Sequence, residues 1–377
     1  MSSLASFRAG FIDEPGYFDY ANVGPLSQRV QEEVLGELDV LRRARFGSLD
    51  HGARQAERVR NAVAALTSFA PENVVFTPNS STALMMTLLG LSGGVMLSPT
   101  DFPSSSYAAV RSAQALGRLI PVWLVTDGGR LTPELVREQA NTGTEALVVS
   151  QVDYRTGARA DLAGLREAIG PDRLLIVNAA QGFGVLDEDY AAADVVLTNG
   201  FKWVRAGYDT GFLAFTDRAL ERIEPVLSGF TASGPEAPLS EVPMPPRKAE
   251  SFQIGPPNPV AQARFSVALE SIAEVGLPVV QQAVLEAAAR IMALADEFGV
   301  PVLTPREDEG RAGIVALAPG EPAAVARLSA ALHNHGITAT RHSDSVRLSV
   351  HVSSDDESFE MLRLALVSYA RASLALS

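Results

Sequence analysis

The sequence predicts an α/β fold in which a large domain built on a mostly parallel sheet precedes a smaller α+β domain. Three observations support this prediction. Short apolar runs alternate with helical patterns through the first two-thirds of the chain. Several of the runs lack polar alternation, as expected of strands that are covered on both faces of a parallel sheet. The chain of 377 residues is also long enough to form a large domain and a smaller one.

The large domain is expected to consist of strands and helices in alternation, which is the order of an α/β layer fold. The predicted strands are 73–77, 94–97, 120–124, 146–152, 174–178, 194–198 and 211–215. The predicted helices between them include 81–91, 104–116, 133–140 and 162–169. Thr132 before Pro133 is typical of a helix start, with a capping hydroxyl and proline at the first helical position.

The composition changes between residues 228 and 259, where prolines, glycines and serines replace the apolar runs. A long irregular connection of this kind is often a functional loop. The smaller domain should follow, with helices at 260–275, 278–298, 323–333 and 355–372, and strands at 300–303, 313–316 and 346–350. We therefore expect a large domain over 17–259 and a small domain over 260–377, with residues 1–16 packing near the small one.

Composition and charge exclude several classes of partner and several kinds of site chemistry. A net charge of −13 and a pI near 4.9 argue against nucleic acid and anionic membranes as partners. No run of 18 apolar residues occurs and the first 13 residues lack a signal-peptide layout, so a cytoplasmic location is expected. The absence of cysteine excludes disulfides, thiolate metal sites and a protein thiol in catalysis. The histidines lack acidic companions at ligand spacing, so no metal site is expected.

Lys202 is the residue on which most of the functional interpretation depends. It lies between Phe201 and Trp203, where an amine is costly to desolvate unless it is paired, neutralised or used covalently. One interpretation is a surface lysine whose stem covers Trp203. The other is a lysine that forms a Schiff base, because an amine in a partly apolar pocket has a lowered pKa and attacks aldehydes.

Eight segments, taken in order, decide between these interpretations. They are YFDYANVGPLS, VVFTPNSSTAL, TDFPSSSY, VSQVDYRTGA, NAAQGFGV, the Lys202 segment, IGPPNP and VRLSVHVSS. With them the chain resembles the class V aminotransferases, pyridoxal-phosphate (PLP) enzymes of fold type I that include cysteine desulfurases, isopenicillin N epimerase and kynureninase. The resemblance implies the fold of a fold-type-I PLP-dependent transferase, PLP as cofactor, and Lys202 as the residue that binds the cofactor covalently.

The resemblance also implies how the cofactor phosphate is held. Asn79, Ser80 and Ser81 match the strand–helix turn that binds it, and the start of a helix suits an anion. The same residues are equally good helix caps, and the two roles are compatible. Asn199 matches a further phosphate contact, and Arg205 is a candidate pocket or phosphate residue.

Around the cofactor ring the resemblance implies four further contacts. Phe102 matches the aromatic residue that stacks on the pyridine, although a core phenylalanine is the alternative. Gln181 matches the residue that hydrogen-bonds the phenolic oxygen, and Asp153 lies where relatives often have an asparagine near that oxygen or the ring edge. Asn178 matches the position next to the pyridine nitrogen.

Three positions depart from the family pattern. Asn178 replaces the aspartate that keeps the pyridine nitrogen protonated, and an amide cannot do this by charge. Phe201 replaces a polar phosphate contact, often a histidine, and Pro256 replaces a common threonine. The sequence therefore predicts a weakened electron sink and an altered phosphate site.

The same resemblance implies which residues contact the substrate and the partner subunit. Arg347 matches the arginine that clamps the substrate carboxylate, for which a planar bidentate donor is suited. Asn22 matches a loop that reaches the active site. His351 shares a strand face with Arg347 and lines the substrate pocket or serves a structural role. Gly255 and Asn258 match a segment that contacts the partner's cofactor phosphate, which implies a homodimer with shared active sites.

We therefore expect a PLP-dependent enzyme that acts at Cα and Cβ of an amino-acid substrate through an external aldimine. Lyase-type β-elimination, such as C–S cleavage of a cysteine conjugate, is favoured by Asn178, while transamination and epimerisation remain alternatives. The lack of cysteine argues against cysteine desulfurase, which needs a thiol to accept sulfur. An alternative of another class is a regulatory homologue that binds the cofactor poorly, suggested by Asn178, Phe201 and Pro256.

Overall fold

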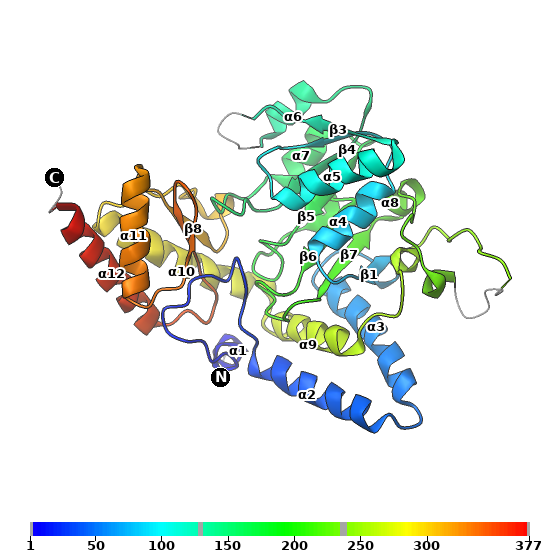
Figure 1. The fold of residues 1–377 in the computed structure, drawn as a ribbon, viewed down its shortest axis with the longest axis horizontal. Helices are drawn as coiled ribbons and strands as arrows, with labels where there is room; N and C mark the ends of the chain where they lie inside the picture. The colour runs from blue at the N-terminus through cyan, green and yellow to red at the C-terminus, as the bar shows by residue number, and fades with distance from the viewer. Residues whose placement is uncertain (1–2, 127–130, 234–239, 375–377) are drawn as a thin grey trace.

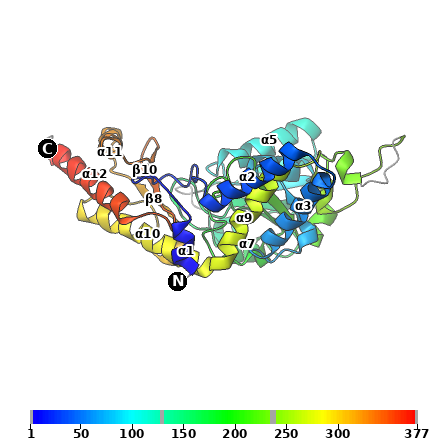
Figure 2. The same cartoon turned by 90° about the horizontal axis from the view of Figure 1, so that it is seen from below.

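The protein consists of two lobes joined side by side, as the computed structural model shows for residues 3–126, 131–233 and 240–374 (Figure 1). The larger lobe contains a seven-stranded sheet with helices on both faces, and the smaller lobe contains a three-stranded sheet with its own helices. The N-terminal helix α1 (Ser3–Ala9) lies at the junction of the lobes, and the chain ends at the far side of the small lobe (Figure 2).

The large sheet has the strand order β1-β7-β6-β5-β4-β2-β3. Its strands are β1 (Val74–Phe76), β2 (Gly93–Leu97), β3 (Leu119–Trp123), β4 (Thr144–Ser150), β5 (Leu174–Asn178), β6 (Val195–Asn199) and β7 (Gly211–Phe215). Only β7 runs antiparallel to its neighbours. Every residue of β5, β6 and β7 is buried, which explains why their sequences show no polar alternation. The prediction of a mostly parallel α/β sheet is confirmed.

The large lobe has more helices than the sequence patterns named. Those that connect the strands are α4 (Ser80–Leu89), α5 (Pro103–Leu116), α6 (Pro133–Gln139), α7 (Leu162–Ile169) and α8 (Asp217–Arg222). A second group, α2 (Gln28–Arg43), α3 (Ser48–Ala64) and α9 (Pro259–Val275), packs together. Short 3₁₀ turns cover 71–73, 190–192, 230–233, 249–252 and 308–310.

The small lobe contains a sheet in the order β8-β10-β9. Its elements are α10 (Leu277–Glu297), β8 (Ile314–Leu317), α11 (Pro322–Asn334), β9 (Thr340–Arg341), β10 (Val346–Ser349) and α12 (Asp356–Leu374). The strand predicted at 300–303 is wrong, because only an isolated bridge from Val302 to Leu317 forms there. Pro301 and Pro305 explain this, since proline cannot donate a hydrogen bond to a continuing ladder.

The packing of α9 bears on where the lobes divide. Phe265, Leu269 and Ile272 of α9 belong to a core shared with strands of the large sheet, whereas Val280 and Val284 of α10 belong to the core of the small lobe. We therefore infer that the division falls near Gly276, between these helices, rather than before α9.

Helix α10 is long and apolar enough, by length and composition alone, to cross a membrane. Half of its most apolar window is buried inside the protein, and buried residues such as Val284, Ala288 and Ile291 face the small-lobe core. This is the pattern of a core helix in a globular protein.

Candidate active site

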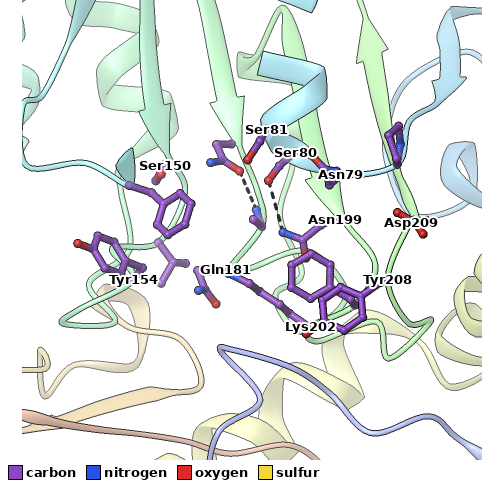
Figure 3. Close-up of a pocket in the computed structure, with 16 residues that line it drawn as sticks. Asn79, Ser80, Ser81, Ser150, Tyr154, Gln181, Asn199, Lys202, Tyr208 and Asp209 are labelled. Atoms are coloured by element: carbon purple, nitrogen blue, oxygen red, sulfur yellow. Dashed lines mark hydrogen bonds between the residues drawn. The ribbon is translucent and has the colours of Figure 1, made fainter. Parts of the chain in front are cut away.

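A cavity of about 360 Å³ opens at the carboxyl ends of the central strands, the usual ligand position in an open α/β sheet. Ser150, Asn178 and Asn199 end β4, β5 and β6, and each lines the cavity. The structure brings together eight residues singled out in the sequence: Asn79, Ser80, Ser81, Phe102, Asn178, Gln181, Asn199 and Lys202 (Figure 3).

Lys202 presents a desolvated amine to this cavity. Its side chain is 8% exposed, and its Nζ lies 5.4 Å from the ring centroid of Phe102 and 5.8 Å from that of Phe201. Within the described residues no hydrogen bond or ion pair reaches the Nζ. Burial, followed by the charge of Arg347, lowers the pKa of Lys202 to about 7, although Asp19 opposes the shift. A large fraction of the amine is therefore neutral and nucleophilic near neutral pH.

The N-terminal segment holds the turn that carries Lys202. The backbone N–H of Gly24 donates to the carbonyl of Phe201 at 2.8 Å. A Cβ at Gly24 would collide with the carbonyl oxygen of Lys202, so only glycine allows this approach. The segment is thus packed directly against the backbone of the reactive lysine.

Arg205 fixes the same segment and does not face the cavity. It has φ of 59°, a left-handed conformation unusual for a residue with a side chain, and it is only 1% exposed. Its guanidinium pairs with Asp13, donates to the carbonyl of Pro25 and lies 4.0 Å from the ring centroid of Phe11. The expectation that Arg205 is a pocket or phosphate residue is therefore wrong, because its charge is already used to anchor the N-terminal segment.

The end of the cavity that was predicted to face the cofactor ring, called the ring end below, is lined by amides whose orientation can be read from their partners. Gln181 donates from Nε2 to the carbonyl of Ala21 at 2.9 Å, and its Oε1 accepts from Trp203 Nε1 at 2.9 Å. One N–H of Gln181 remains for a ligand. Asn178 accepts from the N–H of Ala180 at 3.2 Å through Oδ1, which leaves its Nδ2 as the group offered to the cavity.

The end of the cavity that was predicted to hold the cofactor phosphate, called the phosphate end below, lies at the start of α4. Asn79 caps this helix by accepting from the N–H of Thr82 at 2.9 Å. Within the described residues the N–H groups of Ser80 and Ser81 have no backbone acceptor, as is normal in the first turn of a helix. Two free N–H groups at a helix start, with two hydroxyls beside them, fit a phosphate dianion.

Asn199 and Ser81 are held less firmly than the amides at the ring end. Asn199 donates to Ser80 Oγ at 3.4 Å, and its buried Oδ1 has no partner among the described residues. The Ser81 and Ser104 hydroxyls lie 2.6 Å apart. These polar groups are available to a ligand that supplies both donors and acceptors.

Several lining residues were not identified from the sequence. Tyr208 and Asp209 follow Lys202 in a turn, and the Tyr208 ring stacks on Phe201 with a centroid separation of 4.9 Å. Asp209 has φ of 59°. Tyr154 closes another side, with its ring centroid 5.2 Å from that of Phe102. The glycines flanking the turn, in RAGYDTG, were the available signal, because a tight turn after Lys202 returns its residues to the same cavity.

Asp153 and His351 lie away from this cavity. Asp153 accepts from the N–H groups of Arg155 and Thr156 and lines a neighbouring cavity. Burial opposes the shift, but Arg155 and the Thr156 N–H lower the pKa of Asp153 overall. His351 stacks on Tyr20 and contacts Arg205, and burial lowers its pKa far below the ordinary value. Asp153 therefore does not line the cavity where a contact to the phenolic oxygen or the ring edge was expected. Of the two roles left open for His351, its contacts favour the structural one. His351 belongs to the anchor of the N-terminal segment.

Arg347 and Asn22 lie beside the cavity without lining it. Arg347 is buried and donates to the carbonyl of Tyr154 at 2.9 Å, close enough to Lys202 to affect its charge. Asn22 is exposed and donates to Asp19 at 3.2 Å. Asn258 caps α9 by accepting from the N–H of Val260, and Gly255 precedes it on the same connection.

Within the ranges that the structure describes, no group of three or more His, Asp or Glu side chains is arranged to hold a metal ion.

The comparison with known families completes this picture, since the model for class-V aminotransferases matches residues 27–376. The chain belongs to the class-V aminotransferase family. It is accordingly a PLP-dependent enzyme of fold type I, as the eight sequence segments indicated. The helix start, the free amide donors and the neutralised lysine fit this cofactor.

The class-V relatives include enzymes of more than one activity. A kynureninase from Deinococcus radiodurans is 28% identical over 331 residues, covering 80% of this chain and 78% of its own. A kynureninase from Bacillus cereus is 24% identical over 360 residues, covering 89% and 83%. The apo cysteine desulfurase from Thermococcus onnurineus NA1 is 23% identical, covers 93% of both chains and has a TM-score of 0.80. The cystine C–S lyase C-DES, in complex with cysteine persulfide, is 18% identical with a TM-score of 0.83, covering 93% and 97%. These structures share the fold.

Proposed function

We propose that this class-V enzyme binds an α-amino acid and eliminates a leaving group from its Cβ, as in C–S cleavage of a cysteine conjugate. The observation that carries the proposal is Lys202, a buried amine without a partner among the described residues, whose pKa is lowered to about 7 and which lines a cavity that suits an anion and an aromatic ring. Such an amine serves as both nucleophile and base near neutral pH.

The residues divide the work by position. When bound, PLP supplies an aldehyde that joins the substrate amine and a ring that draws electrons from Cα. The start of α4 would hold the phosphate, and Phe102 and Gln181 would hold the ring. Lys202 would take the Cα proton on Nζ, after which the electron pair forms the Cα–Cβ double bond and the thiolate leaves with the electrons of the Cβ–S bond. Phe102 and Phe201 exclude water beside this amine.

Asn178 supports elimination over transamination. Because its Oδ1 is occupied by the N–H of Ala180, the group that meets the cofactor ring is an N–H donor. A donor favours an unprotonated ring nitrogen, which stores negative charge less well than a protonated one. Elimination suffers least, because the leaving group removes the charge at once.

Two other activities of class-V enzymes are weighed against β-elimination. A kynureninase-type reaction is favoured by relatives of that name, of which one covers 80% of this chain. A cysteine desulfurase that passes sulfur to its own thiol is disfavoured, because the chain contains no cysteine. C–S cleavage with release of sulfur into solution needs no such thiol.

The test is to mix the holoenzyme with cysteine conjugates, cystine, L-kynurenine and L-alanine. Elimination predicts pyruvate and ammonia from the conjugates in equal amounts, with the thiol released. Aminated cofactor from L-alanine would instead indicate transamination. Cleavage of L-kynurenine and of no other compound would indicate a kynureninase-type reaction. A holoenzyme inactive on every compound would contradict the proposal.

The Asn178→Asp variant tests the argument about the ring. An isosteric carboxylate should protonate the ring nitrogen, which ¹⁵N NMR with labelled cofactor measures directly. We expect a ring nitrogen that is unprotonated in the natural enzyme and protonated in the variant, with the product ratio moved toward aminated cofactor. The same nitrogen signal in both proteins would remove the basis for favouring elimination.

We also propose a homodimer in which Gly255 and Asn258 complete the partner's phosphate site. The described part of the connection that carries them, residues 228–233 and 240–258, runs along the edge of the large lobe (Figure 1). Exposed apolar side chains lie on this connection, among them Phe230, Val242 and Met244, and we take them as the candidate interaction surface. Light scattering should give twice the chain mass of 40.0 kDa, and Met244→Glu should lower it. A monomer at micromolar concentration would refute the dimer.

A further inference from the structure

Asp19 is a buried carboxylate to which the reaction outlined above assigns no role. It lies in the N-terminal segment where that segment runs alongside β10 as an isolated bridge to Ser349. Phe18, its neighbour, accepts from the N–H of Ser349 at 2.7 Å. Two residues further on, Ala21 accepts from Gln181 of the large lobe. Asp19 thus lies where the segment passes from the small lobe to the cofactor cavity.

The carboxylate of Asp19 is hydrogen-bonded on both oxygens and is 6% exposed. Its Oδ1 accepts from Thr340 Oγ1 at 2.7 Å and from Arg347 Nη2 at 3.4 Å. Its Oδ2 accepts from Asn22 Nδ2 at 3.2 Å. A buried charge held in this way has a fixed position, because moving it would leave a buried charged partner unpaired, which is strongly unfavourable.

Arg347 is oriented by the same contacts. Its Nη2 donates to Asp19 and to Thr340 at 3.1 Å, and its Nη1 donates to the carbonyl of Tyr154 at 2.9 Å. The guanidinium is 5% exposed, yet its Nε has no partner within the described residues. An unpaired buried N–H on a charged group is unfavourable, so it marks a place where a ligand acceptor can bind.

We propose that Asp19 is the positioning residue of the substrate clamp: with Thr340 it holds Arg347 so that the Nε–H, which has no partner among the described residues, meets the substrate carboxylate. The inference rests on the proposed function, because it takes Arg347 as the clamp.

The pKa of Lys202 provides a readout of the charge on the Asp19 carboxylate in the apoprotein. Arg347 lowers the pKa of Lys202 and Asp19 raises it, so the two members of one ion pair act in opposite directions on the amine. The other charged or titratable groups that line the cavity are Tyr154, Tyr208 and Asp209. Removal of the Asp19 charge therefore leaves the effect of Arg347 unopposed.

The first experiment measures the protonation of Lys202 without cofactor. The chain contains only two lysines, Lys202 and Lys248, and Lys248 pairs with Glu250 at the surface, so it serves as an internal reference. Trace acetylation of the full-length apoprotein between pH 5 and 10, followed by mass spectrometry, gives a titration curve for each amine. The Asp19→Asn variant keeps the shape of the side chain and removes its charge. We expect Asp19→Asn to lower the Lys202 midpoint by about one pH unit, and the exposed control Glu14→Gln to leave it unchanged.

The second experiment measures the clamp in the holoenzyme by cofactor absorption. Glycine carries an amine and a carboxylate, whereas methylamine carries the amine alone, so the ratio of their dissociation constants isolates the carboxylate contact. Asp19→Ala should reduce the preference for glycine by about tenfold or more, with methylamine binding unchanged. Thr340→Val, which removes only the bridging hydroxyl, should reduce it by a few fold and covers the case in which Asp19→Ala does not fold.

The outcomes separate this inference from the proposed function. An unchanged Lys202 midpoint in Asp19→Asn, or an unchanged glycine preference in both Asp19→Ala and Thr340→Val, would overturn the role of Asp19. A protein that binds no cofactor would overturn the proposed function, and the apoprotein titration would then decide on Asp19 alone.

Discussion

The two ends of the cofactor cavity are built differently. At the ring end, Gln181 is held by Ala21 and Trp203, and Asn178 is held by Ala180, so the protein itself fixes what it offers. At the phosphate end, the Oδ1 of Asn199 has no partner among the described residues, and Phe201, which replaces a polar contact of the family pattern, stacks on Tyr208. We infer from this difference that the chain would pre-organise its contacts to the ring, while phosphate binding would depend on the start of α4.

The largest effect should follow the removal of the amine at the ring end. Lys202→Ala should lower kcat/KM by about 10³-fold or more, because both the nucleophile and the base are lost. The visible band of the covalently bound cofactor should disappear with it. The matched control is Lys248→Ala, which removes the other lysine and should keep full activity. Retained activity in Lys202→Ala would show that another group acts as the nucleophile and the base.

The buried amine of Lys202 should also lower the free energy of unfolding of the apoprotein. Its folded pKa of about 7 lies below the ordinary 10.5, so the unfolded chain binds more protons between these values and stability rises with pH across that window. The penalty is therefore fully present below about pH 7. Lys202→Met should stabilise the apoprotein by on the order of 3 kcal/mol at pH 6 and by little near pH 10. Urea unfolding at both pH values measures this, and an equal gain at both would show that charge is not the cause.

The third effect tests the fixed amide at the ring end. Gln181→Leu should destabilise the protein by about 2 kcal/mol, since it leaves the buried Trp203 Nε1–H without an acceptor. Gln181→Glu keeps an acceptor for Trp203 but loses the donor to Ala21. Denaturant unfolding of both variants ranks the two hydrogen bonds. If Gln181→Leu is as stable as the natural protein, the ring end is not held by this network.

Much of this architecture was predictable from the sequence, and the exceptions have physical causes. Buried strands such as β5 and β6 are continuous apolar runs, and the residues at their ends are therefore placed at the cavity by topology alone. The direction of a side chain is harder to predict. Arg205 follows Lys202 by three residues, yet its left-handed backbone turns it toward Asp13.

Partners that are distant in the chain caused the other errors. His351 is enclosed by Phe11, Tyr20 and Arg205, which lie at least 146 residues away and give no local signal. The occupied carboxylate of Asp153 could have been recognised from the sequence. An aspartate commonly accepts hydrogen bonds from the backbone N–H groups two and three residues further along the chain, here Arg155 and Thr156, and so forms a local turn. Its carboxylate was therefore occupied before any ligand is considered.

The smallest effect should come from restoring a donor at the phosphate end. Phe201→His should tighten cofactor binding by about tenfold, because a hydrogen bond from an imidazole to a phosphate is charge-assisted. Phe201→Leu is the control, since it removes the ring that stacks on Tyr208 without adding a donor, and it should bind the cofactor no better than the natural protein. Equilibrium dialysis of the apoproteins measures all three. A tenfold gain in Phe201→His alone would show that the phosphate end is the weaker half of the cavity. Equal affinities would show that the start of α4 already satisfies the phosphate, and the contrast between the two ends would then be one of side-chain order and not of binding strength.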